Sequence, residues 1–88
     1  MRIWAKMWLQ NHLIKDTVIE NYEADSRTHK IFGALEKVST MWDLEKPIWL
    51  DSNVDEFKRH SKTRFTKDSF IEAVDFDYLE IEVIEEDY

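Results

Sequence analysis

Residue types found in hydrolase active sites are present in this chain, but their arrangement does not form a catalytic motif. His60 stands beside Ser61, and Asp55 and Asp68 lie within ten residues, so the components of a Ser-His-Asp triad occur in one region. Adjacent residues on one strand or loop point apart, and a triad is defined by geometry rather than by composition. The single glycine, Gly33, excludes a glycine-rich phosphate loop and a nucleophile elbow. We therefore expect no enzymatic activity.

Metal-binding and redox patterns are equally weak. The three histidines are far apart, and none lies three or four residues from another, so the sequence offers no helical pair of ligands. Glu80 and Glu82 share one face of a predicted strand near Asp77, but hard cations prefer a preformed oxygen cage on a loop. The chain has no cysteine, which excludes disulfides and thiolate sites. We expect neither a metal nor a cofactor.

The strongest functional signal is an alternation of bases and tryptophans at the start of the chain. Arg2, Trp4, Lys6 and Trp8 fall on one side of a predicted strand. Such a surface suits a protein partner or a second copy of the chain, because tryptophan is enriched at interfaces. It also suits single-stranded nucleic acid, whose bases stack on aromatic rings. A third alternative is that the segment 44–60, which contains Trp49, covers both rings. If the rings are exposed instead, Trp49 is a candidate extension of the surface.

Charge is segregated near the end of the chain. Residues 1–74 carry twelve Lys/Arg and twelve Asp/Glu, whereas residues 75–88 carry seven acids and no base, and these acids account for the net charge of −7. Just upstream, residues 57–67 hold five bases and no acid. A net acidic chain disfavours nonspecific binding to nucleic acid or anionic membranes.

The basic segment has two interpretations. Lys58, Arg59, Lys62 and Arg64 are candidate anion-binding residues, and together with the tryptophan face they would make a nucleic-acid-associated protein. Alternatively, the bases pair with the acidic strand of the same molecule, with Lys67 opposite Glu82 and Arg64 opposite Glu85. Charge runs are usually solvated or paired within the chain, so we prefer the second interpretation.

The elements that position these residues begin with a β-hairpin. Residues 2–9 alternate between an apolar side, which contains Ile3 and Met7, and the tryptophan side. Residues 13–20 read as the returning strand, and a turn at Asn11-His12 would set Ala5 opposite Val18. Because the apolar side is the more hydrophobic, we expect a helix to cover it and to leave the tryptophan side without a cover.

One long helix follows the hairpin. Asp25 or Ser26 can cap it, and apolar residues recur at helical spacing up to an end near residues 43–45. Gly33 within this helix suggests a close approach to the sheet. The apolar stripe consists of Ile31, Leu35, Val38 and Trp42.

The remaining elements complete an α+β domain that spans residues 1–88. We expect an edge strand at 48–50, a short helix from residue 52, strands at 63–72 and 76–85, and a frayed acidic end from about residue 86. The predicted architecture is an antiparallel sheet of four to five strands with one long helix on one face, in the order β-β-α-β-(short α)-β-β. No apolar run approaches the length of a membrane span, and we expect a cytoplasmic protein that contacts another protein or itself.

Overall fold

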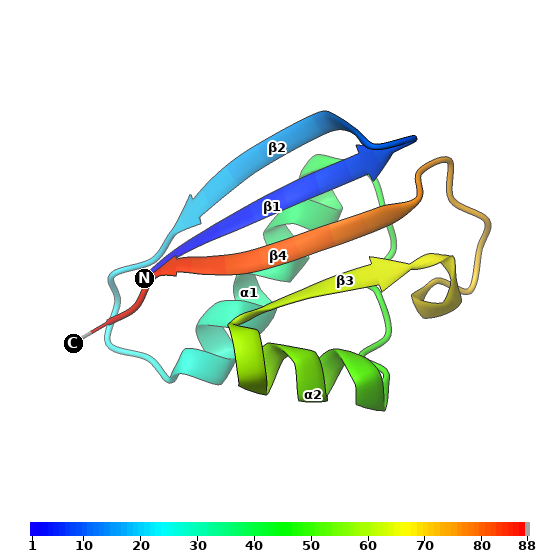
Figure 1. The fold of residues 1–88 in the computed structure, drawn as a ribbon. Helices are drawn as coiled ribbons and strands as arrows, with labels where there is room; N and C mark the ends of the chain where they lie inside the picture. Colours follow the sequence, from blue (N-terminus) through cyan, green and yellow to red (C-terminus); the bar gives the residue numbers. More distant parts are fainter. Residues whose placement is uncertain (88) are drawn as a thin grey trace.

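The computed structural model describes residues 1–87 and shows an α+β fold in which two helices accompany a four-stranded antiparallel sheet (Figure 1). The α+β class and the antiparallel sheet agree with the sequence prediction, whereas the single long helix does not. The elements are β1 (Arg2–Leu9), β2 (His12–Glu20), α1 (Arg27–Met41), α2 (Asp51–His60), β3 (Lys62–Thr66), a 3-10 turn η1 (Lys67–Ser69) and β4 (Tyr78–Glu85).

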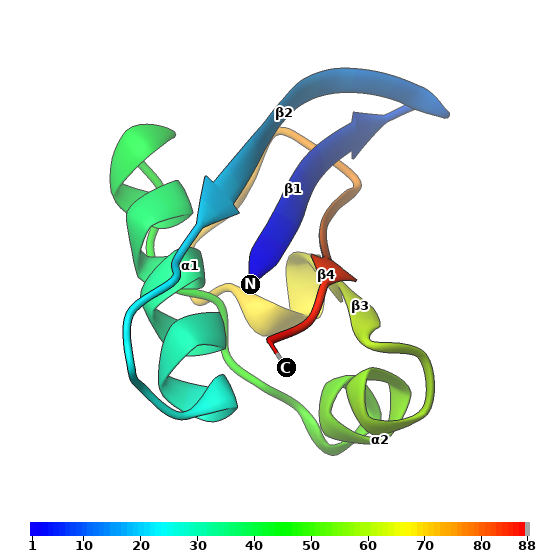
Figure 2. The same ribbon diagram turned by 90° about the vertical axis from the view of Figure 1, so that its left-hand side faces the viewer.

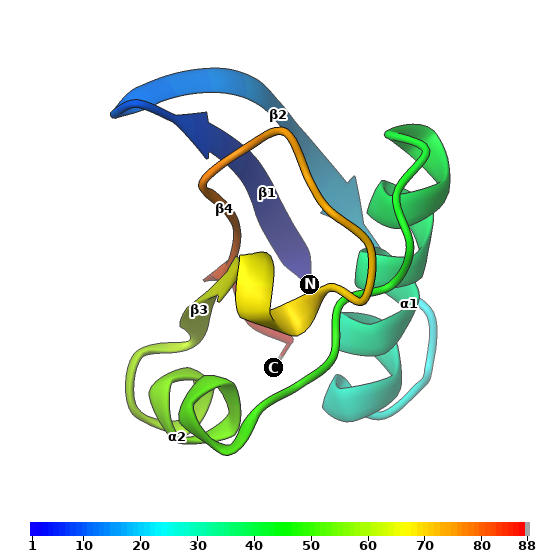
Figure 3. The same cartoon turned by 90° about the vertical axis from the view of Figure 1, so that its right-hand side faces the viewer.

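The strands lie in the order β2-β1-β4-β3, so the last strand of the sequence is inserted between β1 and β3. The predicted strand at 48–50 is wrong, and the element order is β-β-α-α-β-β. The segment between the helices crosses from α1 to α2 on the helix side of the sheet (Figure 3). Its Ile48 N–H donates to the Ser69 carbonyl (2.7 Å), and its Glu45 side chain accepts from the Glu72 N–H (2.9 Å). Its apolar residues serve packing rather than strand pairing.

The amino-terminal hairpin is confirmed, but its turn lies one residue earlier than predicted. Gln10 and Asn11 both have positive φ, 50° and 63°, as a tight two-residue hairpin turn requires. Ala5 therefore pairs with Thr17 rather than with Val18, and a bulge between Met7 and Trp8 absorbs one residue of β2. This register moves the acidic residues of β2 to the tryptophan side of the sheet.

Helix α1 begins where its capping signal indicates, but it ends at Met41, before the predicted end near residues 43–45. The Ser26 hydroxyl accepts a hydrogen bond from the His29 N–H (3.1 Å), which caps the first turn. The stripe containing Ile31, Leu35 and Val38 is buried. A β-carbon added at Gly33 would meet no atom within 4 Å, so the predicted close approach to the sheet is wrong.

Helix α2 is attached to the sheet by the buried side chain of Asn53. Its Oδ1 accepts from the Leu50 N–H (3.0 Å), which satisfies the start of the helix. Its Nδ2 donates to the Thr63 hydroxyl (2.9 Å) and to the Arg64 carbonyl (2.9 Å) on β3. One amide side chain thus fixes the position of α2 relative to the edge of the sheet.

The carboxyl-terminal hairpin has shorter strands and a different register than predicted. β3 stops at Thr66, whose hydroxyl accepts from the Asp68 N–H (3.4 Å) at the start of η1. The long connection from η1 to β4 contains no strand. In the resulting register Arg64 pairs with Glu80, so the predicted pairing with Glu85 is wrong.

Both helices lie on one side of the twisted sheet, as Figure 2 shows. The residues of the strands that point to this side form the core with α1, as expected for the apolar side of β1. Phe65, Leu79 and Ala5 are completely buried there. Other core residues are Ile3, Met7, Ile19, Ile31, Leu35, Val38, Phe57 and Ile81.

Candidate functional site

The opposite side of the sheet, called the open face below, is covered by no helix among residues 1–87 (Figure 2). The predicted cover by segment 44–60 does not occur, because that segment packs on the helix side. Strand alternation and register place on the open face Arg2, Trp4, Lys6 and Trp8 of β1, Asp16, Val18 and Glu20 of β2, Tyr78, Glu80 and Glu82 of β4, and Lys62 and Arg64 of β3.

A buried ion pair lies at the centre of the open face. Lys6 is 6% exposed and Glu80 is 5% exposed, although no backbone element covers them. Lys6 Nζ lies 3.2 Å from Glu80 Oε1 and 3.0 Å from Glu82 Oε1, and Arg64 Nε donates to Glu80 Oε2 (3.1 Å). Charged side chains tolerate this degree of burial only when they are paired and hydrogen-bonded.

Aromatic rings provide the cover for this ion pair. The Lys6 ammonium lies 3.9 Å from the centre of a Trp4 ring, and the Arg64 guanidinium lies 4.4 Å from the centre of the Tyr78 ring. Trp8 packs beside Tyr78 with the ring centres 6.1 Å apart, and its indole N–H donates to Glu80 (3.3 Å). These cation–π contacts shield the ions from water without a covering helix.

The environment of Glu80 keeps its carboxylate ionised. Burial raises its pKa, but hydrogen bonds from Arg64 and Lys6 outweigh burial and hold the pKa below its usual value. A carboxylate held by three donors in this way has no proton to deliver near neutral pH. Glu80 therefore pairs charges within the sheet and does not act as a general acid near neutral pH.

Charge on the open face alternates from strand to strand. Acids occupy β2, bases β1, acids β4 and bases β3, so each strand faces its neighbours with the opposite sign. Counting Glu85, which pairs with Arg2, the face holds four bases and five acids and has a net charge of −1, out of −7 for the chain. These cross-strand pairs favour this strand order and this register.

The structure brings together only part of the predicted interaction surface. Arg2, Trp4, Lys6 and Trp8 share the open face, whereas Trp49 lies on the helix side. Its ring makes an edge contact with Phe65, with the ring centres 5.0 Å apart. Trp49 therefore does not extend the tryptophan surface.

The predicted anion-binding residues are divided between two parts of the molecule. Lys58 and Arg59 belong to α2, whereas Lys62 and Arg64 belong to β3 on the open face. Arg64 is bound to Glu80, as described above. The preferred interpretation was that the basic segment pairs with acids of the same chain. Arg64 does so, but with Glu80 rather than with the predicted Glu85.

The histidine, serine and acidic candidates are not assembled into a site. His29 pairs with Asp25 (3.0 Å) at the start of α1, and Ser61 ends α2, where its hydroxyl accepts from Arg27 (3.3 Å). Asp77 accepts from the Gln10 N–H (2.8 Å). Within residues 1–87 no group of three or more histidines and carboxylates is placed to hold a metal ion.

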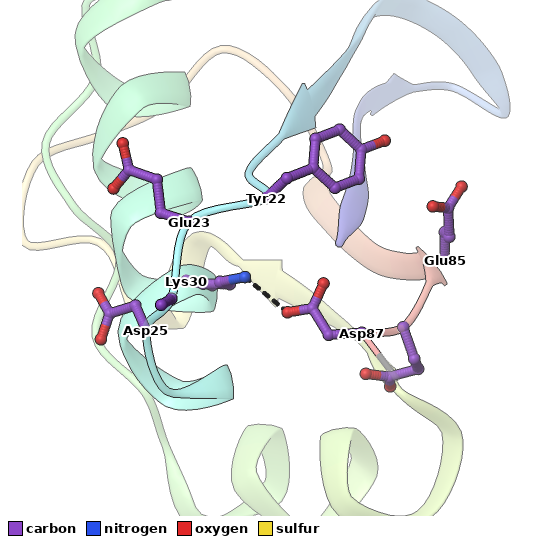
Figure 4. Close-up of a pocket in the computed structure, with 8 residues that line it drawn as sticks. Tyr22, Glu23, Asp25, Lys30, Glu85 and Asp87 are labelled. Carbon is purple, nitrogen blue, oxygen red and sulfur yellow. Dashed lines mark hydrogen bonds and ion pairs between the residues drawn. The ribbon is translucent and has the colours of Figure 1, made fainter.

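A cleft of about 510 Å³ lies between the segment 22–25 and the last described residues (Figure 4). Its buried cation, Lys30, is bound to Asp87 (2.6 Å), and the Met1 ammonium donates to the same carboxylate (2.6 Å). Hydrogen bonds from Lys30 and Met1 lower the pKa of Asp87. Glu86 is paired with Arg27 (2.8 Å), so the carboxylates of Glu86 and Asp87 both attach the end of the chain. Tyr88 lies outside the described residues. The cleft is therefore a structural junction.

Sequence reasoning missed Asp16, Tyr78 and Glu80 as members of the open face. The predicted β1–β2 register was shifted by one residue, and the pairing of β4 with β1 was not predicted. The alternation of β4 is evident in the sequence, and it would have placed Tyr78 and Glu80 beside β1 if the strand order had been known.

Comparison of the chain with protein-family models, with curated proteins and with solved structures finds no match. Neither helix of the described residues has the length and hydrophobicity needed to cross a bilayer. The open face is therefore the basis on which a function can be proposed.

Proposed function

We propose that this chain is a self-associating protein module and that a second copy packs on the open face. The observation that carries this proposal is a row of four residues across the sheet. Asp16, Lys6, Glu80 and Arg64 lie side by side on β2, β1, β4 and β3, and their charges alternate in sign.

This row is complementary to itself after a two-fold rotation about an axis parallel to the strands. The rotation reverses the strand order, so β1 faces the partner's β4 and β2 faces the partner's β3. Asp16 then faces the partner's Arg64. These two exposed ends of the row carry the charge complementarity, because Lys6 and Glu80 are covered by the aromatic rings of their own copy. In the next row Trp8 faces the partner's Tyr78, which pairs aromatic rings across the interface.

The other two-fold axis in the plane of the sheet, perpendicular to the strands, is disfavoured. It would place each strand over its own copy and so bring acids over acids and bases over bases, which costs free energy. Charge complementarity thus selects one arrangement of a symmetric, self-complementary interface.

The area of the open face sets the strength of this association. Four strands about 4.8 Å apart and about 3.3 Å per residue give a surface of about 500 Å² for each copy. The pair would bury about 1,000 Å², which is at the lower limit for specific complexes and typical of weak ones. We therefore expect a dimer that forms at micromolar or higher concentrations.

The experiment is a charge swap followed by sedimentation velocity over a range of protein concentrations. Asp16→Arg would place a second guanidinium over the partner's Arg64, and Arg64→Asp would place a second carboxylate over the partner's Asp16. Each variant alone should dimerise at least about tenfold more weakly than the original chain. An equimolar mixture should recover the dimer. In the mixed pair, position 16 of each copy faces a residue of opposite charge at position 64 of the other copy, whereas in the dimer of either variant alone these two positions carry the same charge.

Controls separate the interface from general charge effects. Glu36→Arg and Lys37→Asp change charge on the exposed side of α1 and should leave association unchanged. Circular dichroism of every variant verifies that the fold is intact. A chain that remains monomeric at millimolar concentration would refute the proposal, and a mixture that does not recover the dimer would refute the axis along the strands.

A further inference from the structure

A second feature lies on the helix side, away from the open face. A groove of about 340 Å³ separates α1 from α2, and we call it the helix groove. Figure 2 shows the two helices that border it. Its walls are mostly apolar and include Phe32 and Ile31 of α1, Val54 and Phe57 of α2, and Trp49 of the connecting segment.

Two large apolar side chains of this groove remain in contact with water. Phe32 is 50% exposed and Val54 is 37% exposed, although both stand next to well-packed rings. Trp49 makes edge contacts with Phe32 and Phe57 at 5.8 and 5.6 Å between ring centres. A rigid aromatic floor between exposed apolar walls is typical of sites for small apolar ligands.

The charged residues of the helix groove have one sign. Arg27 and Lys58 line it, and no acid does. Arg27 is already bound to Glu86, whereas Lys58 has no ion-pair partner within residues 1–87. A groove lined by cations and by no acid favours an anionic ligand over a cationic one.

We propose that the helix groove binds a small amphipathic carboxylate, with an apolar chain along the aromatic floor and the carboxylate beside Lys58. The groove volume of about 340 Å³ lies in the range of small-ligand pockets, and a medium-chain fatty acid represents this class of ligand. The proposal is independent of self-association, because the groove and the open face lie on opposite sides of the sheet.

Nuclear magnetic resonance titration with nonanoate tests this proposal, because the four indole N–H signals report on separate sites. The Trp49 signal should shift with increasing nonanoate, and the signals of Trp4 and Trp8 on the open face should not. Nonanol and nonylamine have the same apolar chain without the negative charge. Nonanol should bind about two- to fivefold more weakly than nonanoate, and nonylamine should bind more weakly still.

Two variants assign the binding to the groove. Lys58→Glu should weaken nonanoate binding about five- to tenfold while leaving the affinity for nonanol within a factor of two. Val54→Trp adds a ring at an exposed position of the groove and should abolish the Trp49 shift for both ligands without disturbing the core. Lys37→Glu, on the exposed side of α1, is the matched charge control and should have no effect.

Three results would overturn the proposal. The first is no shift of the Trp49 signal at millimolar nonanoate. The second is equal affinity for nonanoate and nonylamine, which would remove the role of charge. The third is a similar shift of all the indole signals, which would indicate nonspecific association of the ligand with the protein surface.

Discussion

Strand β1 contributes to both faces of the sheet, and the two faces exclude water in different ways. Ile3, Ala5 and Met7 point to the helices and are buried by apolar packing. Lys6, between them on the other side, is buried almost as well by the rings of Trp4 and by ion pairs with β4. The helix face depends on shape and volume, whereas the open face depends on complementary charge and on aromatic cover.

This difference has an energetic consequence. Apolar burial gains about 25 cal/mol for each Å² removed from water and does not depend on pH. A buried ion pair gains little net stability, because desolvation of the charges offsets most of their attraction, but the loss of one partner is costly. The open face should therefore contribute more to register and partner choice than to stability.

The largest expected difference is between two aromatic truncations. Phe65→Ala removes a completely buried ring from the helix face and should lower the free energy of unfolding by about 3–5 kcal/mol. Trp8→Ala removes a partly exposed ring from the open face and should cost about 1 kcal/mol. Urea denaturation measures both values. Similar losses for the two variants would contradict the distinction between the faces.

The next prediction concerns coupling on the open face. Lys6→Met leaves Glu80 buried with fewer donors and should cost about 1–3 kcal/mol, less than a fully buried pair because the face borders water. Glu80→Gln should have a similar cost. The double variant should lose less than the sum of the two, and a double-mutant cycle measures this coupling. Strictly additive losses would show that the ion pair does not act as a unit.

The pH dependence of stability sharpens the same comparison. Because the pKa of Glu80 is lower in the folded protein than its ordinary value of 4.5, the unfolded chain binds a proton first as the pH falls. The contribution of Glu80 is therefore complete above pH 4.5 and is lost as the pH falls below that value toward the folded pKa. Urea midpoints between pH 7 and pH 3 should decrease more steeply for the original chain than for Glu80→Gln. Parallel curves would contradict the assignment.

The smallest expected effect lies on the outer side of α1. Gly33 is helical and half-buried, and a side-chain carbon there meets no atom within 4 Å. Gly33→Ala should therefore stabilise the protein by about 0.5–1 kcal/mol through helix propensity alone. Thermal unfolding measures this gain, and a decrease in melting temperature would indicate a contact that the structure does not show.

Local signals in the sequence were sufficient for several elements. The alternation of β1, the cap at Ser26 and the apolar stripe of α1 each depend on residues that are near one another in the chain, and each was predicted correctly. The side of β1 that the helices cover was also predicted. Its residues are all apolar, whereas bases and tryptophans alternate on the other side.

Registers and long-range neighbours were not predictable in the same way. The hairpin turn has no glycine to mark it, and Gln10 takes a left-handed conformation that its residue type does not favour. A shift of one residue there moved Asp16 to the other face. The place of β4 beside β1 depends on pairing between the two ends of the chain, for which no short motif exists.

The central place of β4 has a consequence for how the chain folds. The hairpin of β1 and β2 pairs with β4, and β3 pairs only with β4, so neither half of the sheet contacts the other until the last strand enters. An isolated two-stranded hairpin is marginally stable in water. The chain must therefore close its longest loop before the sheet is continuous, and folding waits on a single late, nonlocal step that should be slow and cooperative.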